Sequence, residues 1–280
     1  MSPNTISVLK ADGTQENFDQ SKLLASLEKS GASKEVATEV AEHVARELVG
    51  GITTADIYRH AFSVLHTKQK MASVRYSLRR SLLALGPTGF PFEKFVGEIY
   101  KRKGFTVLLD QMVWGRCVDH EMDVIAWNES KLIMAEAKYH HEFAYKSDVK
   151  VALYVKARFD DLTLATFTSY GPHRKLDEGW LITNTKFTEK AIRYAECSGV
   201  RLLGWNYPEK GNLHDLIEET GVHPVTCLTT LTDKQKQQLM NEGIVLCESI
   251  PKEKEKLRSL GFDERLIADA TSESGLLCPV

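Results

Sequence analysis

The sequence predicts an α/β protein of several domains: a mostly helical N-terminal part, a central mixed sheet flanked by helices, and a small helical C-terminal region. Three observations support this prediction. Apolar residues recur at helical spacings through most of the first 85 positions. Short apolar runs typical of strands alternate with helical segments between residues 92 and 205, as in an α/β sheet. Beyond residue 225, short helical patterns are separated by glycine turns.

Length and composition narrow the possible classes of protein. A chain of 280 residues, 42% of them hydrophobic, is long enough for roughly two domains. The formal net charge is -2, so a nucleic-acid surface would be a local patch. The five cysteines are widely spaced and form no CxxC pair, which argues against a disulfide framework or a structural zinc site. The sequence shows neither a secretory signal nor an apolar run of membrane-spanning length, so we expect a cytoplasmic protein with no membrane partner.

The first 86 residues are expected to form one domain. A strand over residues 6–10 leads into the turn signal Asp12-Gly13. The helical patterns that follow share apolar residues at spacings of three or four, and they cover about residues 22–27, 34–48, 54–65 and 72–85. Thr53 or Thr54 is expected to cap the third of these helices.

A break follows at residues 86–91, where two glycines and two prolines in six positions end any helix. The central domain is expected over residues 90–222 and the C-terminal region over residues 225–280. In the central domain the expected elements are a helix (92–102), three strands (105–109, 121–127, 131–138), a helix (147–159), a strand (180–183), a helix (187–197) and a strand (200–203). This alternation is typical of a mixed sheet flanked by helices.

Two neighbouring strands of the central domain have the most informative side chains. Asp123 lies near the start of one apolar strand, and Glu136 and Lys138 end the next. Neighbouring strands lie ~4.8 Å apart, so Asp123 is expected to approach Glu136 across an antiparallel pair. Glu136 and Lys138 are two positions apart and share a face, whereas Ala137 points the other way. Two carboxylates and a lysine suit a hard divalent cation beside a positioned water, which is chemistry that cleaves phosphodiesters.

The surroundings of these residues strengthen the prediction. Glu93, in the preceding helix, is a third carboxylate and stands eleven residues before Gly104. Downstream, residues 183–191 read TNTKFTEKA, where a strand ends and a helix starts. Over residues 92–205 the chain resembles the PD-(D/E)xK nucleases, and above all the Mrr-type restriction endonucleases. The resemblance implies a restriction-endonuclease-like fold that acts on DNA.

The resemblance also implies roles for particular residues. The implied catalytic residues are Glu93, Asp123, Glu136 and Lys138, and the implied site for Mg²⁺ or Mn²⁺ is formed by Asp123, Glu136 and Ala137. Relatives often have Gln in place of Glu136, and a full negative charge there suits a metal ligand. The alternative is a surface ion pair without a catalytic role, because Glu-x-Lys is common at strand ends. The following helix is rich in cations, namely Lys146, Lys150, Lys156 and Arg158. The face that Lys146 and Lys150 share at a spacing of four would either hold a DNA backbone or be merely solvated.

The N-terminal segment also resembles a known family. Residues 8–13 read VLKADG, residues 18–23 read FDQSKL, and Thr53-Thr54 and Arg75-Tyr76 follow at fitting positions. Over about residues 5–86 the chain resembles the ATP-cone, a regulatory nucleotide-binding module. The resemblance implies that ATP or dATP binds as an effector at Lys10, Lys22 and Arg75, and that the protein forms a homo-oligomer. Lys10 and Lys22 lie near a helix N-terminus, which favours phosphate. The alternative is a helical dimerisation domain without a ligand.

The C-terminal region is expected to contain short helices with Gly243-Ile244 and Gly261-Phe262 turns. This pattern is similar to helix-hairpin-helix DNA-binding units, and a plain helical docking domain is the alternative. For the whole chain we expect a metal-dependent DNA endonuclease under ATP or dATP control, used in defence against foreign DNA or in DNA processing. The alternatives are a nucleotide-sensing DNA-binding regulator that does not cleave, and a ribonuclease.

Overall fold

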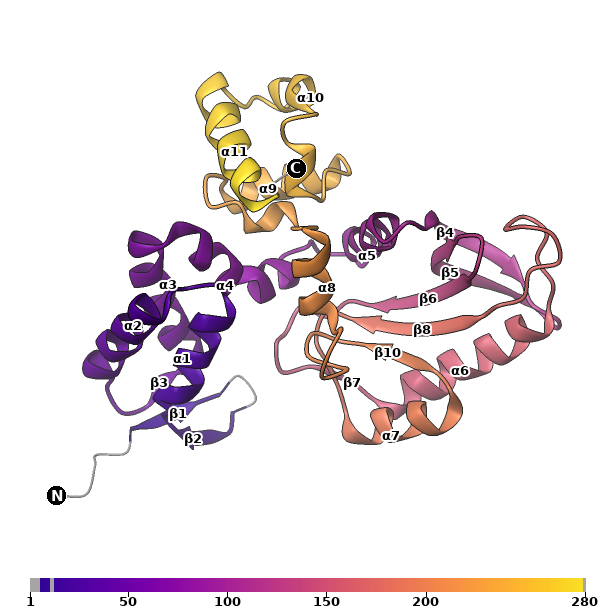
Figure 1. Cartoon of the computed structure of the whole chain (residues 1–280), viewed down its shortest axis with the longest axis horizontal. Coiled ribbons are helices and arrows are strands. Elements are labelled where there is room, and N and C mark those ends of the chain that lie inside the picture. Colours follow the sequence, from indigo (N-terminus) through magenta and orange to yellow (C-terminus); the bar gives the residue numbers. More distant parts are fainter. Residues whose placement is uncertain (1–5, 11–12, 279–280) are drawn as a thin grey trace. The chain divides into compact units, whose positions relative to one another are not determined.

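The structure is a computed structural model that describes residues 6–10 and 13–278. It divides into two compact units, which we describe separately: Met1–Arg80 with Cys227–Thr229, and Ser81–Thr226 with Thr230–Val280. The expected fold class is confirmed, because a mostly helical N-terminal part, a central mixed sheet with flanking helices and a small helical C-terminal part are all present (Figure 1). The residue boundaries of the three expected domains stay predictions.

The N-terminal unit is mostly helical and has a three-stranded sheet in the order β2-β1-β3. Its elements are β1 (Ser7–Leu9), β2 (Gln15–Asn17), α1 (Gln20–Lys29), α2 (Lys34–Glu47), β3 (Ile52–Thr53), α3 (Thr54–Lys68) and α4 (Lys70–Leu83), the last of which continues past the end of the unit. Strands β2 and β3 were not predicted, since strands of two or three residues show no clear periodicity. The expected Asp12-Gly13 turn falls partly on residues 11–12, which lie outside the described residues.

Side chains at the helix starts explain where the N-terminal helices begin. Asp19 and Ser33 accept hydrogen bonds from the first-turn amides of α1 and α2. Of the two candidate caps, Thr53 caps α3, where it forms a capping box with Asp56. Val40 and Val44, spaced by four as expected, are fully buried in the core between the helices.

The second unit is built on a five-stranded sheet in the order β10-β8-β6-β5-β4. Its first elements are α5 (Phe90–Arg102), β4 (Thr106–Trp114), β5 (Asp119–Trp127), β6 (Leu132–Lys138), β7 (Lys146–Ser147), α6 (Val149–Leu164), β8 (Glu178–Thr183), β9 (Lys186–Phe187), α7 (Glu189–Ser198), β10 (Arg201–Leu203) and α8 (Leu213–Thr220). Strands β4, β5 and β6 are antiparallel neighbours, whereas β6, β8 and β10 are parallel. In Figure 1, α5 lies on one face of this sheet and α6 and α7 lie on the other.

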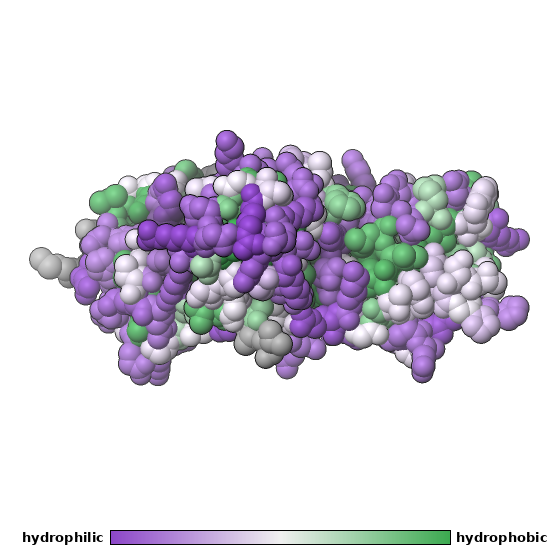
Figure 2. All heavy atoms as spheres, turned by 90° about the horizontal axis from the view of Figure 1, so that it is seen from above, coloured by the Kyte–Doolittle hydropathy of each residue, from purple (hydrophilic) through white to green (hydrophobic). Residues whose placement is uncertain are grey.

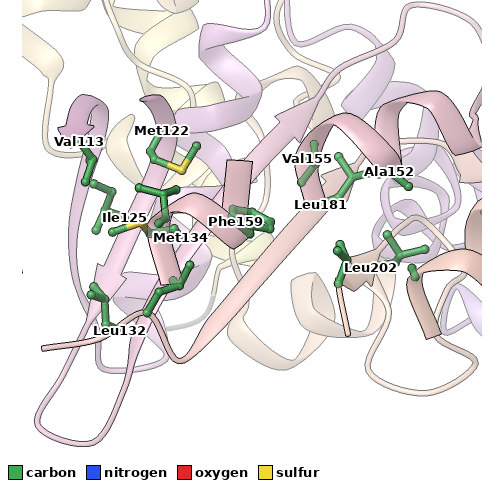
Figure 3. Packing of buried hydrophobic residues seen from close by; sticks show 14 of the residues in the cluster. Val113, Met122, Ile125, Leu132, Met134, Ala152, Val155, Phe159, Leu181 and Leu202 are labelled. Atoms are coloured by element: carbon green, nitrogen blue, oxygen red, sulfur yellow. The ribbon is translucent and has the colours of Figure 1, made fainter. Parts of the chain in front are cut away.

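The main core of this unit fills the space between the sheet and α6 (Figure 3). Ile125, Met134 and Leu181 come from three adjacent strands and are fully buried. Phe159 of α6 packs against Gly179 of β8 so closely that a Cβ on this glycine would lie 2.4 Å from the ring. The glycine therefore allows α6 to approach the sheet.

Two element boundaries differ from the expected ones for identifiable reasons. Strand β4 continues five residues beyond the expected end at residue 109, because it pairs with β5 as far as Trp114. Helix α7 starts at Glu189 and not at residue 187, because Phe187 pairs with β7 and Thr188 caps the helix. In both cases the pairing partner, which the local sequence pattern does not reveal, sets the boundary.

The C-terminal part contains short helices, as expected: η1 (Val225–Cys227), α9 (Asp233–Asn241), η2 (Cys247–Ser249), α10 (Lys254–Ser259) and α11 (Glu264–Leu277). Lys94 of α5 donates a hydrogen bond of 2.6 Å to the carbonyl of Gly243, in the turn after α9. Hydrophilic side chains cover most of the face shown in Figure 2, and apolar ones gather in smaller patches. Within the described residues, no helix has both the length and the apolar character needed to cross a membrane.

Candidate functional site

The hairpin of β5 and β6 brings Asp123 and Glu136 together as the sequence predicts. The strands pair antiparallel with Val124 opposite Ala135, which places Asp123 opposite Glu136. Asp123 Oδ2 accepts a hydrogen bond of 2.6 Å from the backbone N–H of Ala137. Asp123 lies in the middle of β5 and not near its start, since β5 begins at Asp119. This side-chain bond holds the two strands together just beyond their last paired residues.

Glu136 is 4% exposed and has a cation on each carboxylate oxygen. Lys138 Nζ donates to Oε1 at 2.5 Å, and Arg158 Nη1 of α6 donates to Oε2. Arg158, one of the cations noted on the following helix, is buried, and its guanidinium turns toward the sheet. A buried carboxylate needs such partners, since burial without them is costly.

The segment 183–191 fixes the end of β6. Thr183 Oγ1 donates to the carbonyl of Lys138 at 2.8 Å. Asn184 makes two hydrogen bonds with the backbone of His140: its Oδ1 accepts from the N–H, and its Nδ2 donates to the carbonyl. Thr188 caps α7, and Ala191 is fully buried. The pattern identified in the sequence therefore corresponds to a clamp on the strand that positions Glu136 and Lys138.

Glu93 lies in the first turn of α5, which packs against β4 and β5. Burial raises the pKa of Glu93 to about 7, and repulsion from Asp123, Asp110 and Glu136 adds to this rise, while Lys138 opposes it. The structure thus brings Glu93 into the electrostatic environment of the other three expected catalytic residues. A carboxyl group whose pKa lies near neutrality is suited to accept a proton at physiological pH.

The pKa of Asp123 is also raised, to about 6. Burial is the main cause and repulsion from Glu136 is the second, while the Ala137 N–H, Lys138 and Arg158 act in the opposite direction. For both groups burial is the largest cause of the rise in pKa, and repulsion between the neighbouring carboxylates adds to it. Their oxygens are the ligands that Mg²⁺ and Mn²⁺ prefer, so the donor set fits such an ion.

The carboxylates do not form a closed cage. Within the described ranges, Glu93, Asp123 and Glu136 are not a group whose ligand oxygens all lie within 4.8 Å of one another. An ion that keeps several of its waters, as Mg²⁺ usually does, requires no such cage. The residues Asp123 and Glu136 could hold the ion, while the expected contribution of Ala137 stays a prediction, because the hydrogen bond seen in the structure involves its N–H.

Asp110 is a nearby carboxylate that was not predicted from the sequence. It lies in β4, where the pairs Leu109–Val124 and Gln111–Met122 leave Asp110 opposite Asp123. Its backbone is left-handed, with φ of 53°, so the ladder is disturbed beside the site. The strand was expected to end at residue 109, so Asp110 was not placed in the sheet. Its repulsion raises the pKa of Glu93, which makes it part of the site's electrostatics.

The N-terminal unit brings together two of the three expected nucleotide-binding residues. Lys10 Nζ lies 2.7 Å and Lys22 Nζ 3.4 Å from the same oxygen, Glu16 Oε2. The two lysines hold the pKa of Glu16 below its usual range. Lys22 lies in the first turn of α1, where the amide groups of the helix also favour an anion.

The third expected residue, Arg75, lies elsewhere in this unit. A Cβ on Gly31 would lie 3.0 Å from Arg75 Nη1, which places the guanidinium beyond the C-terminal end of α1. Lys22 lies in the first turn of α1, seven residues before the last residue of this helix, which corresponds to about 10 Å along the helix axis. The structure therefore does not group Arg75 with Lys10 and Lys22, and its nucleotide-binding role stays a prediction.

Comparison with known families identifies the parts of the chain. The ATP cone domain family matches residues 6–82, the Mrr-type restriction endonuclease family matches residues 86–206, and the AF1548-like C-terminal family matches residues 223–278. The fold, the site and these matches define a protein with a restriction-endonuclease-like domain and a nucleotide-sensing ATP-cone. The helix-hairpin-helix character expected for the C-terminal region stays a prediction.

Comparison with whole proteins identifies the family. A protein of Archaeoglobus fulgidus described as uncharacterized is 34% identical over 181 residues, which is 64% of this chain and 97% of that protein. The crystal structure of AF1548, a protein of unknown function, is 32% identical, with a TM-score of 0.54 over 67% of this chain and 99% of that one. The chain therefore belongs to the AF1548 family. The MspJI restriction endonuclease in complex with a 27-mer oligonucleotide is 13% identical, with a TM-score of 0.32, and the match covers 53% of this chain and 35% of that one.

Proposed function

We propose that the protein is a metal-dependent DNA endonuclease whose activity is set by ATP or dATP bound to the ATP-cone. The observation that carries this proposal is the grouping of Asp123, Glu136 and Lys138 on one hairpin, with Glu93 beside them. The restriction-endonuclease and ATP-cone families of the two segments support the same conclusion. Defence against foreign DNA and processing of DNA are the two uses that fit.

In the proposed mechanism each of these residues has a separate role. Asp123 and Glu136 would hold Mg²⁺ or Mn²⁺, which supplies Lewis-acid activation of the phosphodiester when bound. Lys138 is partly exposed, so its ammonium group can contact the attacking water or a phosphate oxygen and stabilise the developing charge. Glu93, with its pKa of about 7, is suited to take the proton of that water. Arg158 keeps the Glu136 carboxylate oriented from the opposite side.

A cleavage assay with matched variants tests the proposal. Metal-free protein is incubated with linear, supercoiled, methylated and branched DNA, with and without Mg²⁺ or Mn²⁺. The variants Asp123→Ala and Lys138→Ala should each lose at least about 100-fold in rate, as is typical when a stabilising group of the transition state is removed. The exposed residues Asp160 and Lys190 provide control variants, Asp160→Ala and Lys190→Ala, which should keep the wild-type rate. Cleavage that persists in both site variants would refute the assigned site.

The same assay decides between the alternatives. The simultaneous presence of Glu93, Asp123, Glu136 and Lys138 favours cleavage over a regulator that only binds DNA. Binding of DNA without cleavage under every metal condition would support the regulator. RNA of matched sequence, assayed side by side, distinguishes a ribonuclease.

Control by nucleotide is tested by adding ATP or dATP to the assay and by measuring the oligomeric state in parallel. We expect the cleavage rate to change when either nucleotide is present. The Lys22→Ala variant should respond only at higher nucleotide concentration, because Lys22 adds positive charge at the N-terminal end of α1. Identical rates and identical oligomeric state with and without nucleotide would contradict an effector role.

A further inference from the structure

We propose that the N-terminal unit contains a second metal site, formed by His43, Glu47 and His60, that binds a divalent transition-metal ion such as Zn²⁺. His43 Nε2 lies 3.3 Å from Glu47 Oε1, and His60 Nε2 lies 3.1 Å from Glu47 Oε2. One ligand atom of each residue lies within 4.8 Å of the other two. The proposal is independent of the nuclease function, because all three residues belong to the N-terminal unit.

Helix geometry makes this arrangement a fixed feature of the fold. His43 and Glu47 are four residues apart on α2, so they project from the same face. His60 lies on α3, which packs against α2 (Figure 1). Val44 of α2 and Ala61 of α3, each adjacent in sequence to a ligand, are fully buried. Their packing fixes the rotation of both helices and keeps the three polar side chains facing one another.

The spacing suits a tetrahedral metal ion. Zinc binds histidine nitrogen and carboxylate oxygen at about 2.0–2.2 Å, which places neighbouring ligand atoms about 3.3 Å apart. His43 Nε2 lies 3.3 Å from one oxygen of Glu47 and His60 Nε2 lies 3.1 Å from the other, so each imidazole is at about this distance from the carboxylate. The two imidazole rings are T-shaped, with centroids 5.1 Å apart, and do not stack against each other. All three ligand atoms lie within 4.8 Å of one another, so modest side-chain movement would bring them onto one ion.

The electrostatics and the exposure of the site also favour a cation. Glu47 is the last residue of α2, and the partial negative charge at a helix C-terminus attracts cations. The Glu47 side chain is 54% exposed, and those of His43 and His60 are 37% and 26% exposed. An ion can therefore enter from solvent and keep at least one position for water, as in zinc sites with three protein ligands.

The ligand types define the class of metal. Two imidazoles and a carboxylate suit Zn²⁺, Co²⁺, Ni²⁺ or Cu²⁺, whereas Mg²⁺ prefers oxygen ligands. The competing explanation is a metal-free cluster in which Glu47 accepts hydrogen bonds from both histidines. The two explanations differ in one measurable property, which is whether the imidazole nitrogens become inaccessible when the metal is added.

The test uses the full-length chain without an affinity tag. Calorimetric titration with ZnCl₂ should give one more bound equivalent for the wild type than for the His43→Ala/His60→Ala variant. Metal sites elsewhere contribute equally to both proteins. The Glu47→Gln variant should bind this equivalent about 10–100-fold more weakly, since changes to residues that only hydrogen-bond to a metal ligand already have effects of that size. Glu42→Gln, a change at an exposed position on the same helix, is the matched control and should bind as the wild type does.

A second measurement requires no substitution. Modification of histidines by diethyl pyrocarbonate, followed by mass spectrometry, should show that Zn²⁺ protects His43 and His60 in the wild type. His173, which is exposed in the other unit, should stay reactive, and Mg²⁺ should protect neither His43 nor His60. Equal zinc stoichiometry in the wild type and the double variant, or unchanged reactivity of both histidines, would overturn the proposal.

Discussion

Replacement of Glu93 by Gln should stabilise the metal-free protein at alkaline pH. The pKa of Glu93 is raised from 4.5 to about 7, so the folded protein binds this proton more tightly than the unfolded chain does. Stability associated with the protonated form is lost as the pH rises through about 7. The difference between the two pKa values corresponds to at most about 3 kcal/mol. Because Glu93 is partly exposed, we expect a gain of about 1–2 kcal/mol for the variant at pH 8.

The assay is urea unfolding in EDTA, followed by tryptophan fluorescence. All four tryptophans (Trp114, Trp127, Trp180 and Trp205) lie in the second unit, so the signal reports on the unit that contains Glu93. At pH 5 the gain should shrink to a few tenths of a kcal/mol, because folded Glu93 is then protonated. Glu98→Gln, in the same helix, is the control and should change stability by less than about 0.5 kcal/mol. An equal gain at pH 5 and pH 8, or none at pH 8, would refute the reasoning.

Three further substitutions have defined outcomes. Arg158→Met removes one cation from buried Glu136 and should cost about 3 kcal/mol in the same urea assay, whereas a loss below about 1 kcal/mol would show that Lys138 alone suffices. Gly179→Ala should cost about 1–3 kcal/mol there, because the new methyl group meets the Phe159 ring, and an unchanged midpoint would show that α6 shifts freely. Lys22→Ala should weaken ATP binding about tenfold in calorimetry, because the variant loses about one charged contact. Lys34 is exposed on α2, and the control variant Lys34→Ala should bind ATP as the wild type does.

The central hairpin could be predicted from the sequence because its determinants are local. Two adjacent apolar strands and a short connection fix the antiparallel pairing, and the period of two then places Glu136 and Lys138 on one face. Arg158 could not be placed in the same way. A charged residue on a helix of mixed pattern has no local signal that distinguishes a buried ion pair from a solvated face. Its position depends on the packing of α6 against the sheet, which only the tertiary structure determines.

The small strands of the N-terminal unit were missed for a related reason. The parallel pair of β1 and β3 joins Val8 to Ile52 across two helices, and each strand is too short to produce a periodic pattern. Only part of the grouping of Lys10 and Lys22 around Glu16 could be predicted from the sequence. The lysines were recognised by resemblance, while their shared carboxylate depends on β1 pairing with β2. Long-range pairing therefore accounts for what the sequence did not reveal in both units.

The clamp on β6 has a consequence for the order in which the site is completed during synthesis. The expected catalytic residues lie between Glu93 and Lys138, so a ribosome translates all of them before Arg158 and Asn184. Residues that lie up to 48 positions downstream of Glu136 neutralise its charge and anchor the end of its strand. A nascent chain that has not yet emerged beyond residue 184 therefore contains every residue of the proposed site but lacks the contacts that hold Glu136 and the end of its strand. The proposed cutting of nucleic acid would therefore have to wait until this part of the sheet has been assembled.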